Sequence, residues 1–434
     1  MWYDESVIYQ IYPLGYVGSP EKNDGMLEHR ILKIIEHIPH LKKMGINVIY
    51  FCPVFESSQH GYDTSDYSKI DCRLGTNEDF STVCNELHNN GIRVILDGVF
   101  NHVGRDFFAF KYVQANKYNS IYKDWFYINF DGNTEYNDGF HYESWEGHYE
   151  LVKLNLDNPN VKNYLFDCIR QWIEYFKIDG IRLDVAYMLN KNFMKELRSM
   201  IQGINPEFFL VGEMIHGDYT TIVNDEMLHS ATNYECYKGI YSSFNEMNMF
   251  EISYSLNRQF GSENWCLYTG KNMVSFIDNH DVNRIASAIN NSKHLKLAFG
   301  LLFAMPGIPC IYYGSEWGEE GLKSNGDLSL RPKVDTPKFN KLTRYISRLC
   351  NIRTKNKILA YGNLTNIHIT NHQYVFKRAF EEKGVFVLIN AGDYEYQFDF
   401  DFGVSKGKDL ISNKSIILSN SIILPPYSIQ IIEC

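Results

Sequence analysis

The sequence predicts an α/β protein: a (β/α)8 TIM barrel with a small insertion after strand 3 and a C-terminal antiparallel β-sandwich domain. Eight short apolar runs rich in β-branched and aromatic residues alternate with longer segments of helical periodicity. Alternation alone would also suit an open doubly wound sheet, but no GxGxxG follows the first strand, which favours the barrel. The predicted boundaries are 1–101 and 159–356 for the barrel, 102–158 for the insertion and 357–434 for the C-terminal domain.

Four strand–helix pairs are expected in the first half of the barrel. The strands are expected at Val7–Leu14, Val48–Val54, Arg93–Phe100 and Gly180–Ala186. The helical patterns that follow them are Met26–Met44, Asn77–Asn90, Val161–Lys177 and Lys191–Gly203. Gly45 and Gly91 stand directly after the first two of these helices, a position where glycine commonly ends a helix.

The second half is expected to supply the other four strands. These are Phe208–Met214, Ala231–Cys236, Met273–Asp278 and Cys310–Gly314, of which the second is the weakest. The helical patterns of this half are Gly239–Phe260, Lys293–Ala304 and Pro337–Arg353. Eight strands that alternate with helices are the count of a closed parallel barrel, in which a helix is expected after each strand, although no helical pattern is identified after Phe208–Met214.

Two segments lie outside this alternation. The insertion is rich in aromatic residues, Asn and Gly, and its length is typical of a functional loop or a small subdomain. Its residues Trp125, Phe126, Tyr127 and Trp145 are either platforms for a sugar or the insertion's own core, two readings of equal weight. The C-terminal segment contains no titratable cluster, which indicates a structural role. Its predicted strands are Tyr374–Ala379, Gly384–Asn390, Tyr394–Phe400, Ser415–Leu418, Ser421–Leu424 and Ser428–Glu433.

The composition limits the possible classes of function. The net charge of −10 over 434 residues argues against a nucleic-acid partner. The 31 Tyr, 28 Phe and 6 Trp suit a sugar-binding cleft as well as a large core. Gly and Pro interrupt the uncharged stretch Leu297–Ser315, so no membrane segment is expected. The N-terminus has no basic region before an apolar run and is not a secretory signal, which predicts a cytoplasmic protein.

Polar side chains gather at the predicted C-terminal ends of the strands, where TIM barrels place their active sites. The residues there are His60, Tyr62, Asp97, Asn101, His102, Arg182, Asp184, Glu213, Asn279, His280, Asp281, Glu316, Asp327 and Arg331. A single Asp in such a place is more often a helix cap than a catalyst. Acids, Arg or His at five strand ends are harder to explain structurally, because a barrel has no need to bury so much charge.

The chemistry of these side chains favours glycoside cleavage. No HExxH spacing supports a catalytic zinc ion, and neither a GxSxG elbow nor a P-loop is present. Several carboxylates, one Arg, several His and many aromatic residues remain. Glycoside hydrolysis requires two carboxyl groups that flank the bond, and aromatic rings commonly stack on the sugar faces.

Four motifs in order along the chain resemble those of the α-amylase family of glycoside hydrolases. They are DGVFNH (Asp97–His102), GIRLDVA (Gly180–Ala186), GEMIHGD (Gly212–Asp218) and FIDNHD (Phe276–Asp281). HGYDTSDY (His60–Tyr67) and the LDVA form of the second motif look most similar to the cyclomaltodextrinase, neopullulanase and maltogenic amylase group. That group often dimerises through an N-terminal β domain. The first strand here begins by residue 7, so we expect neither that domain nor a dimer.

The resemblance implies roles for individual residues. Asp184 matches the nucleophile, Glu213 the general acid and base, and Asp281 the third acid, which holds substrate hydroxyls. Arg182 is expected to keep Asp184 ionised. The other residues expected to bind substrate are His60, Tyr62, Asp97, His102, Met214, His280, Asp327 and Arg331.

One departure from the family pattern concerns metal binding. Calcium-dependent members end the second motif in Lys-His, whereas this sequence has Ala186 and Tyr187 there. The resemblance therefore implies no required cofactor and no catalytic metal. It leaves a structural calcium ion open, because Asp97 and Asn101 are present. The turn at Asn23–Gly25 could also hold a cation, although an ordinary turn explains it better.

The resulting hypothesis is a retaining hydrolase of α-1,4-glucosidic bonds in maltodextrins and short malto-oligosaccharides, with cyclodextrins and pullulan as further substrates. An α-1,6-acting or exo-acting α-glucosidase, or a transglycosylase, would use the same site. The alternative from another class is an inactive relative that only binds sugar. All three expected acids are present, which disfavours that alternative.

Overall fold

Eight parallel strands form a closed barrel in the computed structural model, which describes residues 1–418 and 420–434. The strand order is β13-β12-β11-β5-β2-β1-β15-β14, and a parallel bridge between Thr232 and Val274 joins the two ends. The strands in chain order are β1 (Ile8–Ile11), β2 (Val48–Phe51), β5 (Arg93–Gly98), β11 (Gly180–Leu183), β12 (Phe209–Gly212), β13 (Ser230–Ala231), β14 (Val274–Ser275) and β15 (Ile308–Tyr312). The predicted TIM barrel is confirmed.

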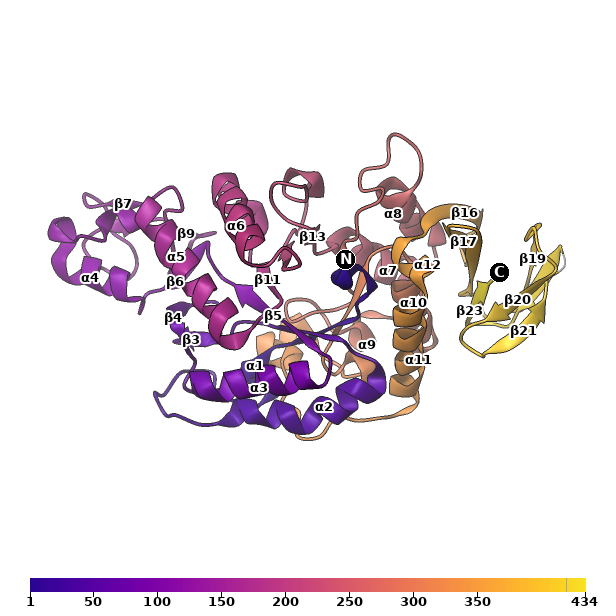
Figure 1. Ribbon diagram of the computed structural model, residues 1–434, viewed down its shortest axis with the longest axis horizontal. Helices are drawn as coiled ribbons and strands as arrows, with labels where there is room; N and C mark the ends of the chain where they lie inside the picture. The colour runs from indigo at the N-terminus through magenta and orange to yellow at the C-terminus, as the bar shows by residue number, and fades with distance from the viewer. Residues whose placement is uncertain (419) are drawn as a thin grey trace.

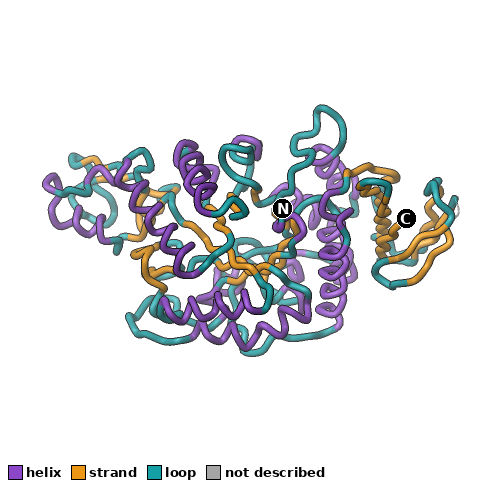
Figure 2. Tube along the Cα trace, viewed as in Figure 1, coloured by secondary structure: helices purple, strands orange, loops and turns teal. Residues whose placement is uncertain are grey.

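Helices cover the outside of the barrel, as Figures 1 and 2 show. Helix α2 (Lys33–Met44) buries Ile34, Ile38 and Leu41, which lie on one helix face, and Gly45 ends it with a φ of 87°. The larger helices are α2 (Lys33–Met44), α3 (Asn77–Asn89), α5 (Pro159–Gln171), α6 (Lys191–Ile204), α7 (Tyr234–Asn245), α8 (Met249–Phe260), α10 (Leu295–Ala304) and α11 (Lys341–Lys355). The shorter ones are α1 (Pro13–Tyr16), α9 (Ile285–Ala288) and α12 (Lys357–Tyr361).

Three predictions for the middle of the barrel are wrong. The expected strand Ala231–Cys236 stops early, because the side chain of Asn233 already caps α7. The expected helix Gly239–Phe260 is split into α7 and α8, and Met247 between them has a left-handed φ of 50°. The described residues between β12 and β13 contain only a 3-10 turn, Tyr219–Thr221, so β12 lacks the expected α-helix.

The insertion after β5 is a small subdomain with its own aromatic core, at the far end of the molecule from the C-terminal strands (Figure 1). Trp125 and Phe126 are 8% and 3% exposed and pack against Phe107, Phe108 and Phe110. Trp125 and Phe126 therefore belong to the insertion's own core and are not platforms for a sugar. The elements of the insertion are β6 (His102–Gly104), α4 (Phe108–Asn116), β7 (Ile128–Asn129), β8 (His141–Tyr142), β9 (Ser144–Trp145) and β10 (His148–Lys153).

The C-terminal segment is an antiparallel β domain, as predicted. Its main sheet has the order β16-β17-β18-β23-β20-β21, and β19 pairs with β22. Val375, Leu388 and Phe398 lie in a core between the two sheets. The strands are β16 (Asn363–Ile369), β17 (Gln373–Phe380), β18 (Lys383–Asn390), β19 (Tyr396–Asp399), β20 (Lys406–Asp409), β21 (Lys414–Ile417), β22 (Ser421–Leu424) and β23 (Ser428–Glu433). The sequence did not predict β16 or β20.

A hairpin after β2 brings a polar loop to the rim of the barrel. It consists of β3 (Phe55–Ser57) and β4 (Thr64–Ile70), which pair in antiparallel fashion. Asp63 in the loop accepts hydrogen bonds from the backbone N–H groups of Ser58, Gln59 and Gly61. These bonds lie within the loop and fix its shape, and the loop carries His60 and Tyr62, two of the expected sugar-binding residues.

Candidate active site

Arg182 on β11 is the centre of a buried cluster of carboxylates. Its Nη1 donates to Asp97 Oδ1 at 2.9 Å and to Asp184 Oδ1 at 2.7 Å. Its Nη2 lies 2.7 Å from Glu213 Oε1. All four residues are at most 5% exposed. One guanidinium therefore holds the expected nucleophile and the expected general acid a short distance apart, with Asp97 on the same side as Asp184.

The backbone after Asp184 turns sharply to hold the second acid. Val185 has a left-handed φ of 39°, a conformation that β-branched residues rarely adopt and that costs about 1–3 kcal/mol. Its N–H donates to Glu213 Oε2 at 3.0 Å. The Tyr234 hydroxyl donates to Glu213 Oε1 at 3.4 Å, and Asn279 Nδ2 donates to that hydroxyl at 3.1 Å. The strained turn thus orients Glu213 toward Asp184.

The charge of the cluster favours retention of a proton. Burial raises the pKa of Asp184 well above its ordinary value; Arg182 opposes this rise, and the Glu213 and Asp97 carboxylates add to it. Arg182 does lower the pKa, as the sequence predicted, but burial has the larger effect. Three carboxylates share one guanidinium and behave as one coupled group. A nucleophilic role requires Asp184 to be ionised, and its contact with Arg182 favours that form.

His280 and Asp281 form an ion pair at the end of β14. His280 Nε2 lies 3.0 Å from Asp281 Oδ2, and Arg331 Nη2 donates to Asp281 Oδ1 at 3.3 Å. Burial lowers the pKa of His280, but Asp281 and Cys52 outweigh it and raise this pKa to about 10. His280 and Arg331 hold the pKa of Asp281 well below its ordinary range, against the effect of burial. The third acid is therefore ionised at neutral pH.

Tyr62 links this pair to the Arg182 cluster. Its hydroxyl donates to Asp97 Oδ2 at 3.2 Å and is in contact with His280 Nε2. The Tyr62 and His280 rings lie in nearly parallel planes, 4° apart, with centroids separated by 5.5 Å. Tyr50 also donates to Asp97 Oδ2, at 2.6 Å. The expected stacking aromatic therefore lies between the two groups of acids.

Arg331 and Asp327 continue the site outward. Arg331 Nη2 lies 3.0 Å from Asp327 Oδ2, and its guanidinium covers the Tyr12 ring at 4.5 Å. These three residues line a pocket of about 380 Å³ together with His60. His60 contacts Asp63 at 3.5 Å and accepts a hydrogen bond from Tyr62 N–H at 3.2 Å. The two expected outer residues thus belong to a continuous polar surface with Asp281.

His102 and Trp145 lie on the opposite side, where the insertion meets the barrel. His102 is 2% exposed, and its Nε2 has no hydrogen-bond partner among the described residues. Burial, with a smaller effect of His60, lowers its pKa to about 3, so the ring is neutral. Trp145 has its ring centroid 6.0 Å from that of His102. An unpartnered ring nitrogen beside an aromatic face suits a sugar hydroxyl.

A two-residue turn of the insertion contacts the loop that follows Asp184. Glu146 and Gly147 have φ values of 49° and 88° and connect paired Trp145 and His148, as in a type I′ hairpin. The Tyr187 hydroxyl donates to Glu146 Oε1 at 3.4 Å, which links the insertion to the loop after Asp184. The Tyr187 ring packs against His216, 5.4 Å away. The hairpin is therefore linked to the segment that follows Asp184.

Met214 follows Glu213, the expected general acid, in the chain and is 5% exposed. Its backbone N–H donates to Thr232 Oγ1 at 3.0 Å. This bond ties the residue after Glu213 to the residue that closes the barrel. The assignment of the Met214 side chain to a leaving-group subsite stays a prediction.

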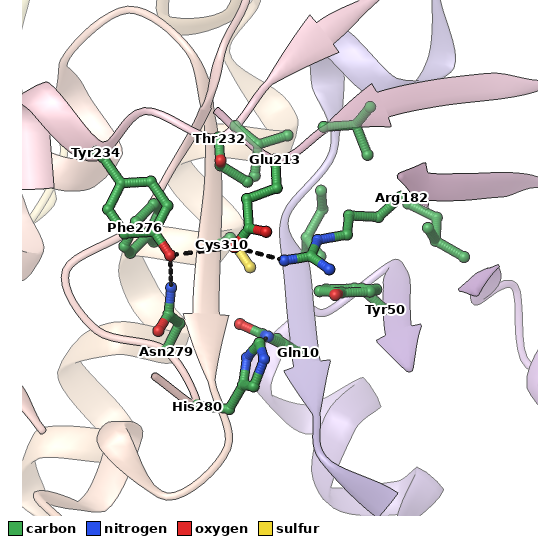
Figure 3. A pocket seen from close by; sticks show the side chains of 14 residues that line it. Gln10, Tyr50, Arg182, Glu213, Thr232, Tyr234, Phe276, Asn279, His280 and Cys310 are labelled. Carbon is green, nitrogen blue, oxygen red and sulfur yellow. Dashed lines mark hydrogen bonds and ion pairs between the residues drawn. The ribbon is translucent and has the colours of Figure 1, made fainter. Parts of the chain in front are cut away.

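A cavity of about 30 Å³ lies in the barrel beneath the acids (Figure 3). Glu213 extends into it between Tyr234 and Arg182, which lie on opposite sides, and the Gln10 amide and the His280 ring lie next to each other. This space suffices for about one or two water molecules. Tyr50, Thr232 and Cys310 complete its polar lining.

Several contributing residues were not identified from the sequence. Tyr50 and Gln10 lie on strands and point inward, while Tyr234 begins a helix. The sequence predicts Asn279 at a strand end but gives it no role. In the structure its Nδ2 donates to the Tyr234 hydroxyl, which in turn donates to Glu213. Alternation along β1 would have placed Gln10 in the barrel interior, where a polar residue has to find a partner. No local pattern marks Tyr234, because its partner is far away in the sequence.

Among the described residues, one group could offer three ligands to a cation: Glu56, Asp71 and Cys72. Asp71 is already bound to Arg73, with its Oδ2 2.7 Å from Nη2. The Nδ2 of Asn101, a candidate calcium ligand, contacts His102 Nδ1 at 3.2 Å. Neither place has the several free oxygen ligands that calcium requires. Among the described residues, these two places therefore resemble a calcium site only weakly.

The comparisons with known proteins agree with this geometry. The family model described as "Alpha amylase, catalytic domain" matches residues 10–357. The chain is 30% identical to the maltogenic alpha-amylase of Bacillus acidopullulyticus, over 96% of this chain and 75% of that protein. It is 32% identical to a cyclomaltodextrinase of Thermoanaerobacter pseudethanolicus, over 90% of this chain and 70% of that protein. A solved cyclomaltodextrinase structure superposes with a TM-score of 0.89 at 26% identity, over 100% of this chain and 78% of that one.

Paired carboxylates at the strand ends of a TIM barrel are the arrangement that glycoside cleavage requires, and the matching family model and relatives place this chain among the glycoside hydrolases. Within that class, this chain belongs to the α-amylase family, because the family model covers most of it. No helix in the described residues has the length and apolar character needed to cross a membrane.

Proposed function

We propose that this enzyme hydrolyses α-1,4-glucosidic bonds in maltodextrins and short malto-oligosaccharides with retention of configuration. The observation that carries this proposal is the contact of one guanidinium with both Asp184 and Glu213, at 2.7 Å in each case. A retaining glycosidase needs its two carboxyl groups about 5–5.5 Å apart. Relatives named maltogenic alpha-amylase and cyclomaltodextrinase support the choice of substrate.

The first step forms a covalent intermediate. Asp184 attacks the anomeric carbon through Oδ2, which no described residue engages, while Arg182 holds Oδ1. Glu213 gives its proton to the departing glycosidic oxygen. Asp281 and His280 hold hydroxyls of the same sugar, and the ring of Tyr62 covers its face.

The second step releases the sugar. Glu213, now ionised, removes a proton from water, and that water displaces Asp184 from the anomeric carbon. An acceptor sugar in place of water would give transglycosylation. The pocket beside Arg331 would take further glucosyl units of the same chain.

The product profile tests this proposal. Purified protein is incubated with maltoheptaose, β-cyclodextrin, pullulan and panose, and products are followed over time. We expect glucose and maltose from the α-1,4 substrates, with panose left intact. Glucose together with maltose from panose, the products of cleaving its α-1,6 bond, would instead indicate an α-1,6-acting or exo-acting α-glucosidase, and longer products would indicate a transglycosylase. No cleavage of any α-glucan would leave the inactive sugar-binding alternative.

We propose that catalysis requires no metal ion. Arg182 and His280 supply the positive charge next to the acids, and Ala186 and Tyr187 replace the Lys-His pair of calcium-dependent relatives. We expect activity on maltoheptaose to stay within about twofold after dialysis against EDTA, because no step needs a cation. Thermal unfolding of the treated protein is the control. Complete loss of activity that calcium restores would contradict this expectation.

We also propose a cytoplasmic monomer that acts on imported oligosaccharides. A relative named intracellular maltogenic amylase from Bacillus subtilis supports the location. Light scattering of the purified protein tests the oligomeric state: a mass near 50.7 kDa is expected, and twice that mass would show a dimer.

A further inference from the structure

The buried amide of Gln10 lies under the histidine that is expected to hold the cleaved sugar. Gln10 is on β1 and is 4% exposed. Its Nε2 is 2.9 Å from Nδ1 of His280 and donates to Cys52 Sγ at 3.2 Å. In Figure 3 the Gln10 amide and the His280 ring lie next to each other. The Sγ of Cys52 also lies near His280 Nδ1, at 3.7 Å.

The other side of the His280 ring determines which nitrogen carries a proton. Nε2 faces Asp281 Oδ2 at 3.0 Å and the Tyr62 oxygen. Asp281 is an acceptor only, and Tyr62 gives its own proton to Asp97. Nε2 therefore has to be the donor. Nδ1 is then left to accept a bond in the neutral ring, or to donate one in the charged ring.

A glutamine amide is suited to both cases. It offers an N–H to a bare Nδ1, and after a half-turn it offers a carbonyl oxygen to a protonated Nδ1. In the structure the N–H side faces His280. A carboxylate would serve only the charged ring, and an apolar side chain would serve neither.

We propose that Gln10 is a positioning residue that holds the His280 ring with Nε2–H directed at Asp281 and the cleaved sugar. This inference rests on the proposed glycosidase function. Gln10 acts through His280 and does not touch the reacting atoms. Gln10 lies on β1, whose four residues are all buried. The barrel therefore fixes the position of Gln10, and Gln10 in turn fixes the orientation of the His280 ring.

The charged groups around His280 come from several segments. Asp281 follows it, Arg331 Nε donates to its carbonyl oxygen at 3.3 Å, and Tyr12 stacks on the ring at 6.2 Å. Tyr62 and Cys52 come from the segment after β2. The elevated pKa of His280, about 10, means that the ring is mostly charged at neutral pH. For the charged ring, a half-turn of the Gln10 amide would present its carbonyl oxygen in place of the N–H group that faces His280 in the structure, and a carboxylate would serve that state as well.

The test compares Gln10→Leu with Gln10→Glu on maltotriose. Gln10→Leu should lower kcat about 10- to 100-fold with KM changed less than about threefold, because the ring loses its support when the transition state forms. Gln10→Glu should restore kcat to within about fivefold of the wild type between pH 6 and 8. Tyr9→Phe is the control: it removes a 2.6 Å bond from Tyr9 to Glu316 on the same strand and should leave kcat unchanged.

A spectroscopic measurement separates this inference from the function. With 15N-labelled histidine, and His280→Gln to assign the signal, the Nδ1 resonance of His280 should move in Gln10→Leu while the Nε2 resonance stays in place. This outcome does not depend on the substrate. An unmoved Nδ1 resonance, or an unchanged kcat in Gln10→Leu, would overturn the inference. If the leucine variant does not fold, Gln10→Met against Gln10→Glu gives the same comparison.

Discussion

Replacing Asp184 by Asn or Glu213 by Gln should reduce kcat on maltotriose by about 10⁴-fold or more. Each change removes a carboxylate that forms or breaks a bond in the reaction, and such losses are among the largest in enzymology. Both variants should fold, because an amide in place of one of three buried carboxylates relieves repulsion around Arg182. Stopped-time assays of released sugar, with thermal unfolding of each variant, measure the two effects.

Azide distinguishes the two roles. In Glu213→Ala, azide should react with the intermediate on Asp184 and give an α-glycosyl azide. In Asp184→Ala, azide should occupy the place of the nucleophile and give the β-glycosyl azide. Asp327→Asn is the control, since Asp327 is half-exposed and should change kcat less than tenfold. Unchanged turnover in both Asn and Gln variants would refute the assignment of the acids.

Replacing Arg182 by Met should lower the free energy of unfolding by about 3–5 kcal/mol, because three buried carboxylates lose their one buried cation. Arg182 is the influence that lowers the pKa of Asp184. Without it, that pKa lies still further above its value in the unfolded chain, so the native state binds more protons than the unfolded state. Stability of the variant should therefore fall as the pH rises from about 4 toward neutrality. Urea unfolding of the wild type and of Arg182→Met at several pH values measures this free energy of unfolding.

A matched arginine provides the control. Arg93 is on the neighbouring strand β5, where its Nη1 lies 2.8 Å from Asp179, and its side chain is 41% exposed. Arg93→Met should cost no more than about 1 kcal/mol, since exposed ion pairs contribute little. A loss in Arg182→Met that is equally small, or that does not change with pH, would show that the carboxylates are not coupled through Arg182.

Much of the barrel was predictable because its signals are local. Apolar runs of strand length and helical spacing marked seven of the strands well, and glycines marked helix ends. The sixth strand was predicted too long, because β13 has only two residues. Asn233 caps the helix that follows it, and Tyr234 begins that helix. The 3-10 turn after β12, Tyr219–Thr221, leaves no pattern of its own, since its three residues are too few to show a periodicity.

The candidate site was predictable where function requires particular residues at the ends of strands. Asp184, Glu213 and Asp281 are brought to one rim, as expected. The supporting contacts were less accessible to sequence reasoning. Tyr234 reaches Glu213 from 21 positions away and Gln10 reaches His280 from 270 positions away. Such pairs depend on the closure of the barrel, which no short stretch of sequence encodes.

The closure of the barrel also bears on how the enzyme loses activity on heating. The seam between β13 and β14 consists of two short strands joined through the bridge of Thr232 and Val274. Thr232 also accepts the N–H of Met214, next to the general acid. Local opening is cheapest where few backbone bonds hold an element. The seam would therefore open before the rest of the barrel. Heat inactivation would then begin at the segment that carries Glu213, and not in the surface loops.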